Sequence, residues 1–260
     1  MKLTVLIDNV AGGKLLAEHG LSYLIEHDEK AVLFDTGHSM AFLKNAFSLG
    51  IDIPSDIDTV VLSHGHWDHG DGLRYIHNKT LITHPSAFIK RYRRNTDVSI
   101  GLSLTKEEVE KKFRLIETAD PYFITEKIIF LGGIPRLNSF ESKQTTFVDE
   151  NGNDDFVPDD SALVLINDNA LIIVAGCSHA GICNIIEYAK KITGIGKIKA
   201  VIGGFHLKGK DEQTQNTINY LKGINSEYLF PSHCTEFAAL VEFYNAFGLQ
   251  QVKTGRVIGL

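Results

Sequence analysis

Apolar runs about as long as a single β-strand recur along the first third of the chain, separated by turn residues. Such runs predict buried strands, and the ranges are 2–8, 21–27, 30–37 and 58–64. One helix is expected among them, at 39–50, where Ser39 suits an N-cap and Gly50 suits the end of the helix.

The middle of the chain, residues 84–118, breaks this rhythm of strands. Thr105 and Glu108 have the spacing of a capping box, in which each side chain bonds to the backbone of the other residue. The segment also carries many charges. We therefore expect 84–118 to form an inserted helical segment that covers a functional site.

The second half of the chain changes from strands alone to alternating strands and helices. Strands are predicted at 122–132, 161–167, 170–176, 198–204 and 228–233, and helices at 181–192, 211–223 and 235–247. A β-rich half followed by an α/β half predicts two sheets packed together with helices outside them. The fold class is therefore α/β.

Composition limits the size and the partners of the protein. The chain has 260 residues, 43% of them hydrophobic, which is enough for one large domain spanning 1–260. A net charge of −6 gives no general attraction to nucleic acid or to acidic membranes. The first apolar run is short and carries Asp8, so neither a signal peptide nor a membrane span is expected.

The chain has 3 cysteines, and so small and odd a number argues against a disulfide framework. They indicate a reducing compartment, and the cytoplasm is the expected location.

Histidine and aspartate crowd into one short stretch, "HGHWDH", at the end of the strand predicted at 58–64. His64 and His66 leave the same face of an extended chain, and Asp68 and His69 follow within one turn. Imidazole and carboxylate groups suit zinc, iron or manganese. Four candidate ligands exceed the needs of one open metal site, so we expect two metals, with His64 and His66 on one and Asp68 and His69 on the other.

Three later strands also end in loops that carry histidine: His179, His206 and His233. Ligands bind at the carboxyl ends of strands in open α/β folds. His179 and His233 are expected metal ligands. His206 is either a ligand or an acid/base that faces the substrate, and the second role is favoured. Asp68 and His206 are thus the candidate catalytic residues.

The H-x-H-x-D-H motif resembles the signature of the metallo-β-lactamase superfamily. "LFDTG" resembles its upstream motif, with Asp35 in the place of the acidic residue, and "PSHCT" resembles the segment of its last metal-binding histidine. The resemblance implies a four-layer αββα sandwich and two divalent metal ions, of which zinc is expected first and manganese, iron or magnesium after it. Asp35 is expected to bond to a ligand histidine rather than to metal.

A narrower resemblance is carried by "AEHGLSYLIE", "GCSHAGICNII" and "IGGFHL". These stretches resemble the subfamily that contains the archaeal dihydropterin–ribofuranosylaminobenzene phosphate synthase of methanopterin biosynthesis. Two positions depart from the superfamily pattern. Asp159 or Asp160 replaces one ligand histidine, or His179 takes its role. Cys177 or His179 replaces the bridging aspartate, so Cys177 and Asp160 are further candidate ligands.

Candidate substrate-binding residues lie outside the histidine cluster. His19 lines the pocket or serves as a cap. Cations crowd residues 90–94, and Arg91 and Arg94 there, together with Arg136, form either a phosphate clamp or a solvated surface. A clamp would select a small anionic substrate.

Three functions are compatible with these residues. The first is a hydrolase in which metal-activated water attacks an ester, amide or phosphoester. The second is a transferase that resembles the synthase and joins a hydroxymethyldihydropterin diphosphate to an arylamine. The third is a ligand sensor without catalysis, which the intact ligand set argues against.

Overall fold

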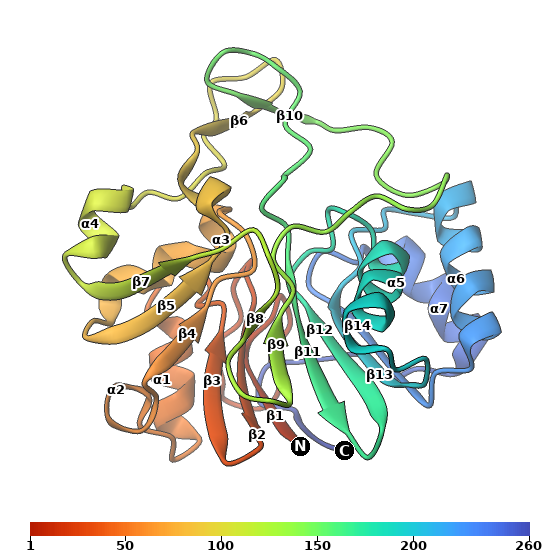
Figure 1. The fold of residues 1–260 in the computed structure, drawn as a ribbon, viewed down its shortest axis with the longest axis horizontal. Helices are drawn as coiled ribbons and strands as arrows, with labels where there is room; N and C mark the ends of the chain where they lie inside the picture. Colours follow the sequence, from red (N-terminus) through yellow and green to blue (C-terminus); the bar gives the residue numbers. More distant parts are fainter.

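Two mixed β-sheets form the centre of the molecule in the computed structural model, which describes residues 1–260 (Figure 1). The first sheet has 7 strands in the order β15-β1-β2-β3-β4-β5-β7. The strands are β1 (Lys2–Ile7), β2 (Ser22–His27), β3 (Lys30–Phe34), β4 (Thr59–Val61), β5 (Lys79–Thr83), β7 (Phe113–Glu117) and β15 (Val257–Gly259). From β3 to β7 neighbouring strands are parallel.

The second sheet has 6 strands in the order β14-β13-β12-β11-β9-β8. They are β8 (Tyr122–Phe123), β9 (Ile128–Phe130), β11 (Ala162–Asn167), β12 (Ala170–Ala175), β13 (Ile198–Gly204) and β14 (Tyr228–Ser232). Strands β12, β13 and β14 are parallel. Their carboxyl ends therefore meet at one edge, where the loops with the later histidines begin.

Helices cover the outer face of each sheet (Figure 1). On the first sheet these are α1 (Ala41–Ser48), α2 (Ile53–Asp56) and the short α4 (Lys106–Glu110), and on the second α5 (Ile182–Thr193), α6 (Glu212–Ile224) and α7 (Phe237–Phe247). Three apolar layers separate these four layers: one between the sheets and one under each set of helices. The fold is the expected αββα sandwich. None of the helices combines the length and apolar character that a membrane span requires.

The segment 84–118 is not the helical insertion that its charges suggested. It contains a short 3-10 turn, η2 (Pro85–Phe88), strand β6 (Arg91–Arg93), the 5-residue helix α4 and strand β7. The capping box of Thr105 and Glu108 is present. Residues after it leave the helix because Phe113 and its neighbours pair in register with β5 and extend the first sheet, so tertiary pairing overrides helical propensity.

A two-stranded sheet covers the end of the sandwich instead. Strand β6 pairs antiparallel with β10 (Phe147–Asp149), and Figure 1 shows this pair above the loops at the ends of the large sheets. Other boundaries shifted slightly: α1 begins at Ala41, whose N–H donates to Ser39 Oγ over 3.1 Å, and the strand expected at 122–132 divides into β8 and β9.

Candidate metal centre

The "HGHWDH" loop follows β4 of the first sheet and continues into the one-turn helix α3 (Trp67–Gly70). It faces the loops that follow β12, β13 and β14 of the second sheet. The site therefore lies where the carboxyl ends of parallel strands from both sheets meet, below β6 and β10.

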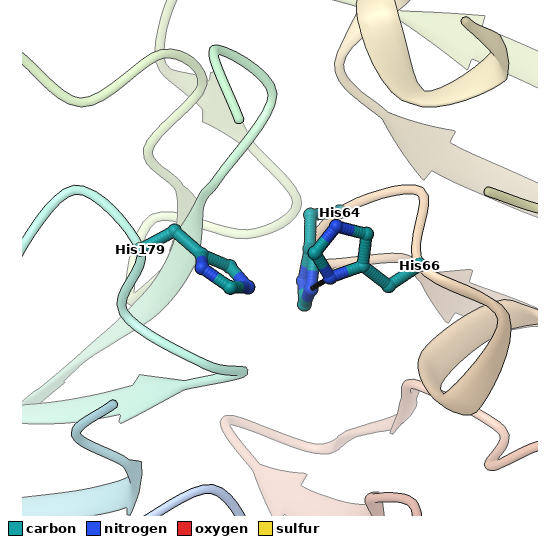
Figure 2. A group of neighbouring side chains, drawn as sticks. All are labelled: His64, His66 and His179. Carbon is teal, nitrogen blue, oxygen red and sulfur yellow. Dashed lines mark hydrogen bonds between the residues drawn. The ribbon is translucent and has the colours of Figure 1, made fainter. Parts of the chain in front are cut away.

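His64, His66 and His179 form the first triad of converging donors (Figure 2). Their ligand nitrogens lie within 4.8 Å of one another, and His64 Nε2 lies 3.1 Å from His66 Nδ1. All three side chains are buried. Burial, and then the neighbouring histidines, holds the pKa of each well below the usual value, so the neutral, metal-binding form is favoured.

Asp68, His69 and His233 form the second triad. His69 Nε2 and His233 Nε2 are 3.1 Å apart, and Asp68 Oδ2 lies 3.8 Å from the first and 3.4 Å from the second. The donor atoms of His64, His69 and Cys177 also lie within 4.8 Å of one another, so the two triads adjoin. The division of the "HGHWDH" loop between two metals stays a prediction.

The donors in these triads fit divalent metal ions. The Nε2 atoms of His66 and His179 are buried without a hydrogen-bond partner, a costly arrangement unless a ligand satisfies them. A set of three imidazoles, and a set of two imidazoles and a carboxylate, are both suited to zinc and similar ions.

Asp35 supports the second triad from behind, as expected. Its carboxylate accepts hydrogen bonds from the backbone N–H and the hydroxyl of Ser63, each over 2.7 Å, and lies 2.6 Å from His69 Nδ1. Burial alone would lower the pKa of His69, but the carboxylates of Asp35 and Asp68 raise it to about 9. Asp35 thus fixes the orientation of the ring and leaves Nε2 facing the centre.

Asp160 does not join either triad, contrary to its candidate role as a ligand. Its carboxylate accepts the backbone N–H of Ala180 over 2.8 Å, and burial raises its pKa to about 7. Asp159 likewise accepts the N–H of Gly65 over 2.6 Å. The two carboxylates hold the backbone of the loops that carry the triads.

Cys177, His206 and Cys234 form a third group beside the triads, with donor atoms within 4.8 Å of one another. Cys177 Sγ also lies 3.1 Å from His69 Nε2, so this thiol reaches the second triad. His206 belongs to neither triad, and its Nδ1 is buried without a partner.

Two cavities flank the centre. One of about 610 Å³ is lined by His19, Trp67, Asp68 and Cys177 among others, and His19 Nε2 lies 3.3 Å from Asp68 Oδ2. The other, of about 830 Å³, is lined by polar residues that include Lys143. The residues common to both cavities are Thr146, Phe147, His179, His206 and Lys208.

Phe147 of β10 stands over the first triad. Its ring centroid is 5.0 Å from that of His66 and 5.7 Å from that of His179. The surrounding stretch has no regular apolar period, so this residue was not predicted from the sequence. Lys208 was not predicted either, although that lysine follows His206 by two positions.

The predicted arginine clamp is wrong. Arg91 is fully buried and pairs with Asp159 at 2.7 Å and with Asp155 at 3.1 Å. Arg94 pairs with Asp154 at 2.5 Å, away from both cavities.

Arg136 is also outside the cavities, since it donates to the carbonyl of Phe156 and lies over that ring. The arginine that does line a cavity is Arg93. Arg91 and Arg93 lie two positions apart on β6 and leave the same face of the strand. Arg91 is buried against Asp155 and Asp159, whereas Arg93 is exposed.

Comparisons with known proteins agree with this architecture. The family model of the metallo-β-lactamase superfamily matches residues 16–85. The chain is 34% identical to 7,8-dihydropterin-6-methyl-4-(β-D-ribofuranosyl)-aminobenzene-5′-phosphate synthase of Methanocaldococcus jannaschii, over 99% of this chain and 96% of the synthase. It is 35% identical to an uncharacterised protein of the same organism, over 99% of this chain and 100% of the relative.

Among solved structures, the metal-dependent hydrolase Tm1679 of the β-lactamase superfamily superposes with a TM-score of 0.89 at 30% identity, covering 100% of this chain and 99% of Tm1679. A diphosphatase from the PhnP family shares the fold at 14% identity, with a TM-score of 0.56 and coverage of 100% and 97%. The full-length relatives, the family model and the two triads lead to one assignment: the chain belongs to the metallo-β-lactamase superfamily.

Proposed function

We propose that the protein is a metal-dependent hydrolase that cleaves an ester, amide or phosphoester bond of a small anionic substrate. The observation that carries the proposal is the pair of adjacent donor triads that the "HGHWDH" loop forms with His179 and His233. His64, His66 and His179 would hold one divalent ion, and Asp68, His69 and His233 a second, with zinc as the preferred metal. Ions held there lower the pKa of water and stabilise developing negative charge.

The residues around the triads would bind and orient the substrate. Lys208 lines both cavities and Arg93 lines one, so their charges can hold an anionic group on either side of the centre. His206 lines both cavities, its ring centroid lies 4.3 Å from that of His179, and it is our candidate for proton transfer to the leaving group. His19, beside Asp68, would contact the substrate in the smaller cavity.

A second candidate is a synthase reaction like that of the archaeal relative. It is favoured by 34% identity over nearly the whole of both chains. Two cavities that meet below Phe147 also suit two reactants that approach the centre from opposite sides. In that reaction the metal ions would hold the leaving diphosphate of the pterin substrate. An arylamine would attack the methylene carbon of the pterin.

One experiment compares the candidates directly. Zinc-loaded protein is incubated with a panel of anionic esters, amides and phosphodiesters, and separately with a hydroxymethyldihydropterin diphosphate and an aminobenzoate acceptor. Hydrolysis without the acceptor supports the hydrolase, and a new carbon–nitrogen bond supports the synthase. The His64→Ala variant is the control, because either activity must disappear with the first triad. Zinc-loaded protein inactive on both sets would contradict both proposals and favour a sensor.

We place the protein in the cytoplasm, where its free cysteines would stay reduced.

A further inference from the structure

We propose that Cys177 and Cys234 form a modification site in which a hydroperoxide oxidises the two thiols to a disulfide beside the metal centre. The two Sγ atoms lie within 4.8 Å of each other, and the Cys234 thiol contacts the backbone carbonyl of Cys177 over 3.4 Å. The two cysteines come from loops after different strands, β12 and β14, so no local turn dictates their proximity.

The backbone around the pair leaves space for the sulfur atoms. A Cβ atom at Gly204 would lie 2.4 Å from Cys234 Sγ and 3.3 Å from Cys177 Cα. The glycine at the end of β13 therefore lets Cys234 rest directly against the backbone of Cys177. A disulfide requires the two sulfurs, now within 4.8 Å of each other, to approach to about 2.05 Å.

A small oxidant can reach the pair. Cys177 and Cys234 both line the 610 Å³ cavity. Cys183, in contrast, is buried in α5 within the apolar layer between that helix and the second sheet. Cys183 is therefore an internal control: it meets the same oxidant in the same solution, but it has no neighbouring thiol and does not line the cavity.

The reaction balances with the peroxide as the only co-reactant. One thiol attacks the peroxide O–O bond, forms a sulfenic acid and releases water. The second thiol then attacks the sulfenic sulfur, forms the S–S bond and releases another water. The two sulfurs together lose two electrons and two protons, and hydrogen peroxide is reduced to two water molecules.

Closure of the disulfide would change the second triad. Cys177 Sγ now lies 3.1 Å from His69 Nε2, and a bond to Cys234 would change that contact. The bond would also tie the loop after β12 to the residue that follows His233. Oxidation should therefore lower metal content reversibly, whichever bond the enzyme cleaves or forms.

The test treats metal-loaded protein with hydrogen peroxide and counts thiols by Ellman's reagent after denaturation. Wild type should fall from three thiols to one, lose 2 Da in mass and give a peptide that links Cys177 to Cys234. Cys183→Ser should form the same link. Cys177→Ser and Cys234→Ser should form no internal link, and the second variant decides if the first fails to fold. Bound metal, measured by elemental analysis, should decrease with the cross-link and return when dithiothreitol and metal are added.

Other results would overturn the proposal. Three thiols that survive peroxide, or separate mass gains of 16 or 32 Da on single cysteines without a link, would show that the pair does not close. Unchanged metal content in fully linked protein would overturn the connection to the second triad. None of these measurements uses enzymatic activity, so their outcome does not depend on the proposed hydrolysis.

Discussion

The Nε2 atoms of His69 and His233 lie 3.1 Å apart, although the two residues are 164 positions apart in the chain. His69 belongs to the loop after β4 of the first sheet, and His233 follows β14 of the second. The second triad therefore exists only when the two sheets are docked. Metal binding is consequently coupled to the tertiary fold, because the unfolded chain cannot present this site.

Metal removal should lower the thermal stability. A free metal concentration of about 100 times the Kd stabilises the native state by about 2.7 kcal/mol per site. This corresponds to an increase in Tm of roughly 5–10 °C for a chain of this size. Differential scanning fluorimetry of dialysed protein, with and without added zinc, measures this difference. An equal Tm in both samples would contradict the coupling.

His64→Ala should reduce the bound zinc by about one ion per chain, because the first triad would keep only two protein ligands. Both candidate activities should disappear, while the fold persists. Elemental analysis and circular dichroism measure these outcomes. His77→Ala is the matched control, since His77 is exposed and lies outside all the donor groups. Wild-type zinc content in His64→Ala would remove the basis for the first site.

Arg91→Ala should destabilise the protein by about 3–5 kcal/mol, because the substitution leaves the carboxylates of Asp155 and Asp159 buried without their cation. Arg94→Ala should change the free energy of unfolding by only about 0–1 kcal/mol, since its ion pair is partly exposed. Urea denaturation curves compare the two variants. Similar values for both would show that the buried pair contributes no more than the surface pair.

Substrate affinity should depend on Arg93 and Lys208, because these cations line the cavities. Replacing both by alanine should raise KM for an anionic substrate about tenfold or more, the loss expected for charge-assisted contacts of about 1.5–3 kcal/mol. Zinc content should stay at the wild-type value. Steady-state kinetics, with Arg94→Ala as the control cation, measure the effect. A KM that rises equally in the control would indicate only a general effect of net charge.

The sequence was informative where chemistry is dense and periodic. The "HGHWDH" spacing predicts the two triads because a strand followed by a one-turn helix has few alternative geometries. The alternation of strands and helices after residue 170 predicts the sheet edge at which the loops of His179 and His233 begin. These features depend on local backbone geometry and on the common direction of parallel strands, and both can be predicted from a single sequence.

Other features depend on distant partners. Arg91 and Arg93 are indistinguishable as charges in the sequence, and the buried carboxylates of Asp155 and Asp159 distinguish Arg91 as the buried one. Phe113 lies in a helix-like stretch that becomes a strand because β5 offers an edge. Phe147 reaches His66 from a segment with no regular period. In each case the deciding contact comes from far along the chain.

The covering pair of strands, β6 and β10, is bonded to the "HGHWDH" loop. Arg91 of β6 donates to the Asp159 carboxylate through two nitrogens, at 2.7 and 3.2 Å. The same carboxylate accepts the N–H of Gly65, which lies between His64 and His66. The backbone of Trp67 also donates to Ile100 beyond β6. Lifting the cover would expose a buried charge and disturb His64 and His66 together. In the proposed reaction, reactants would enter and leave through the two cavities, and turnover should proceed without a rate-limiting opening of the cover.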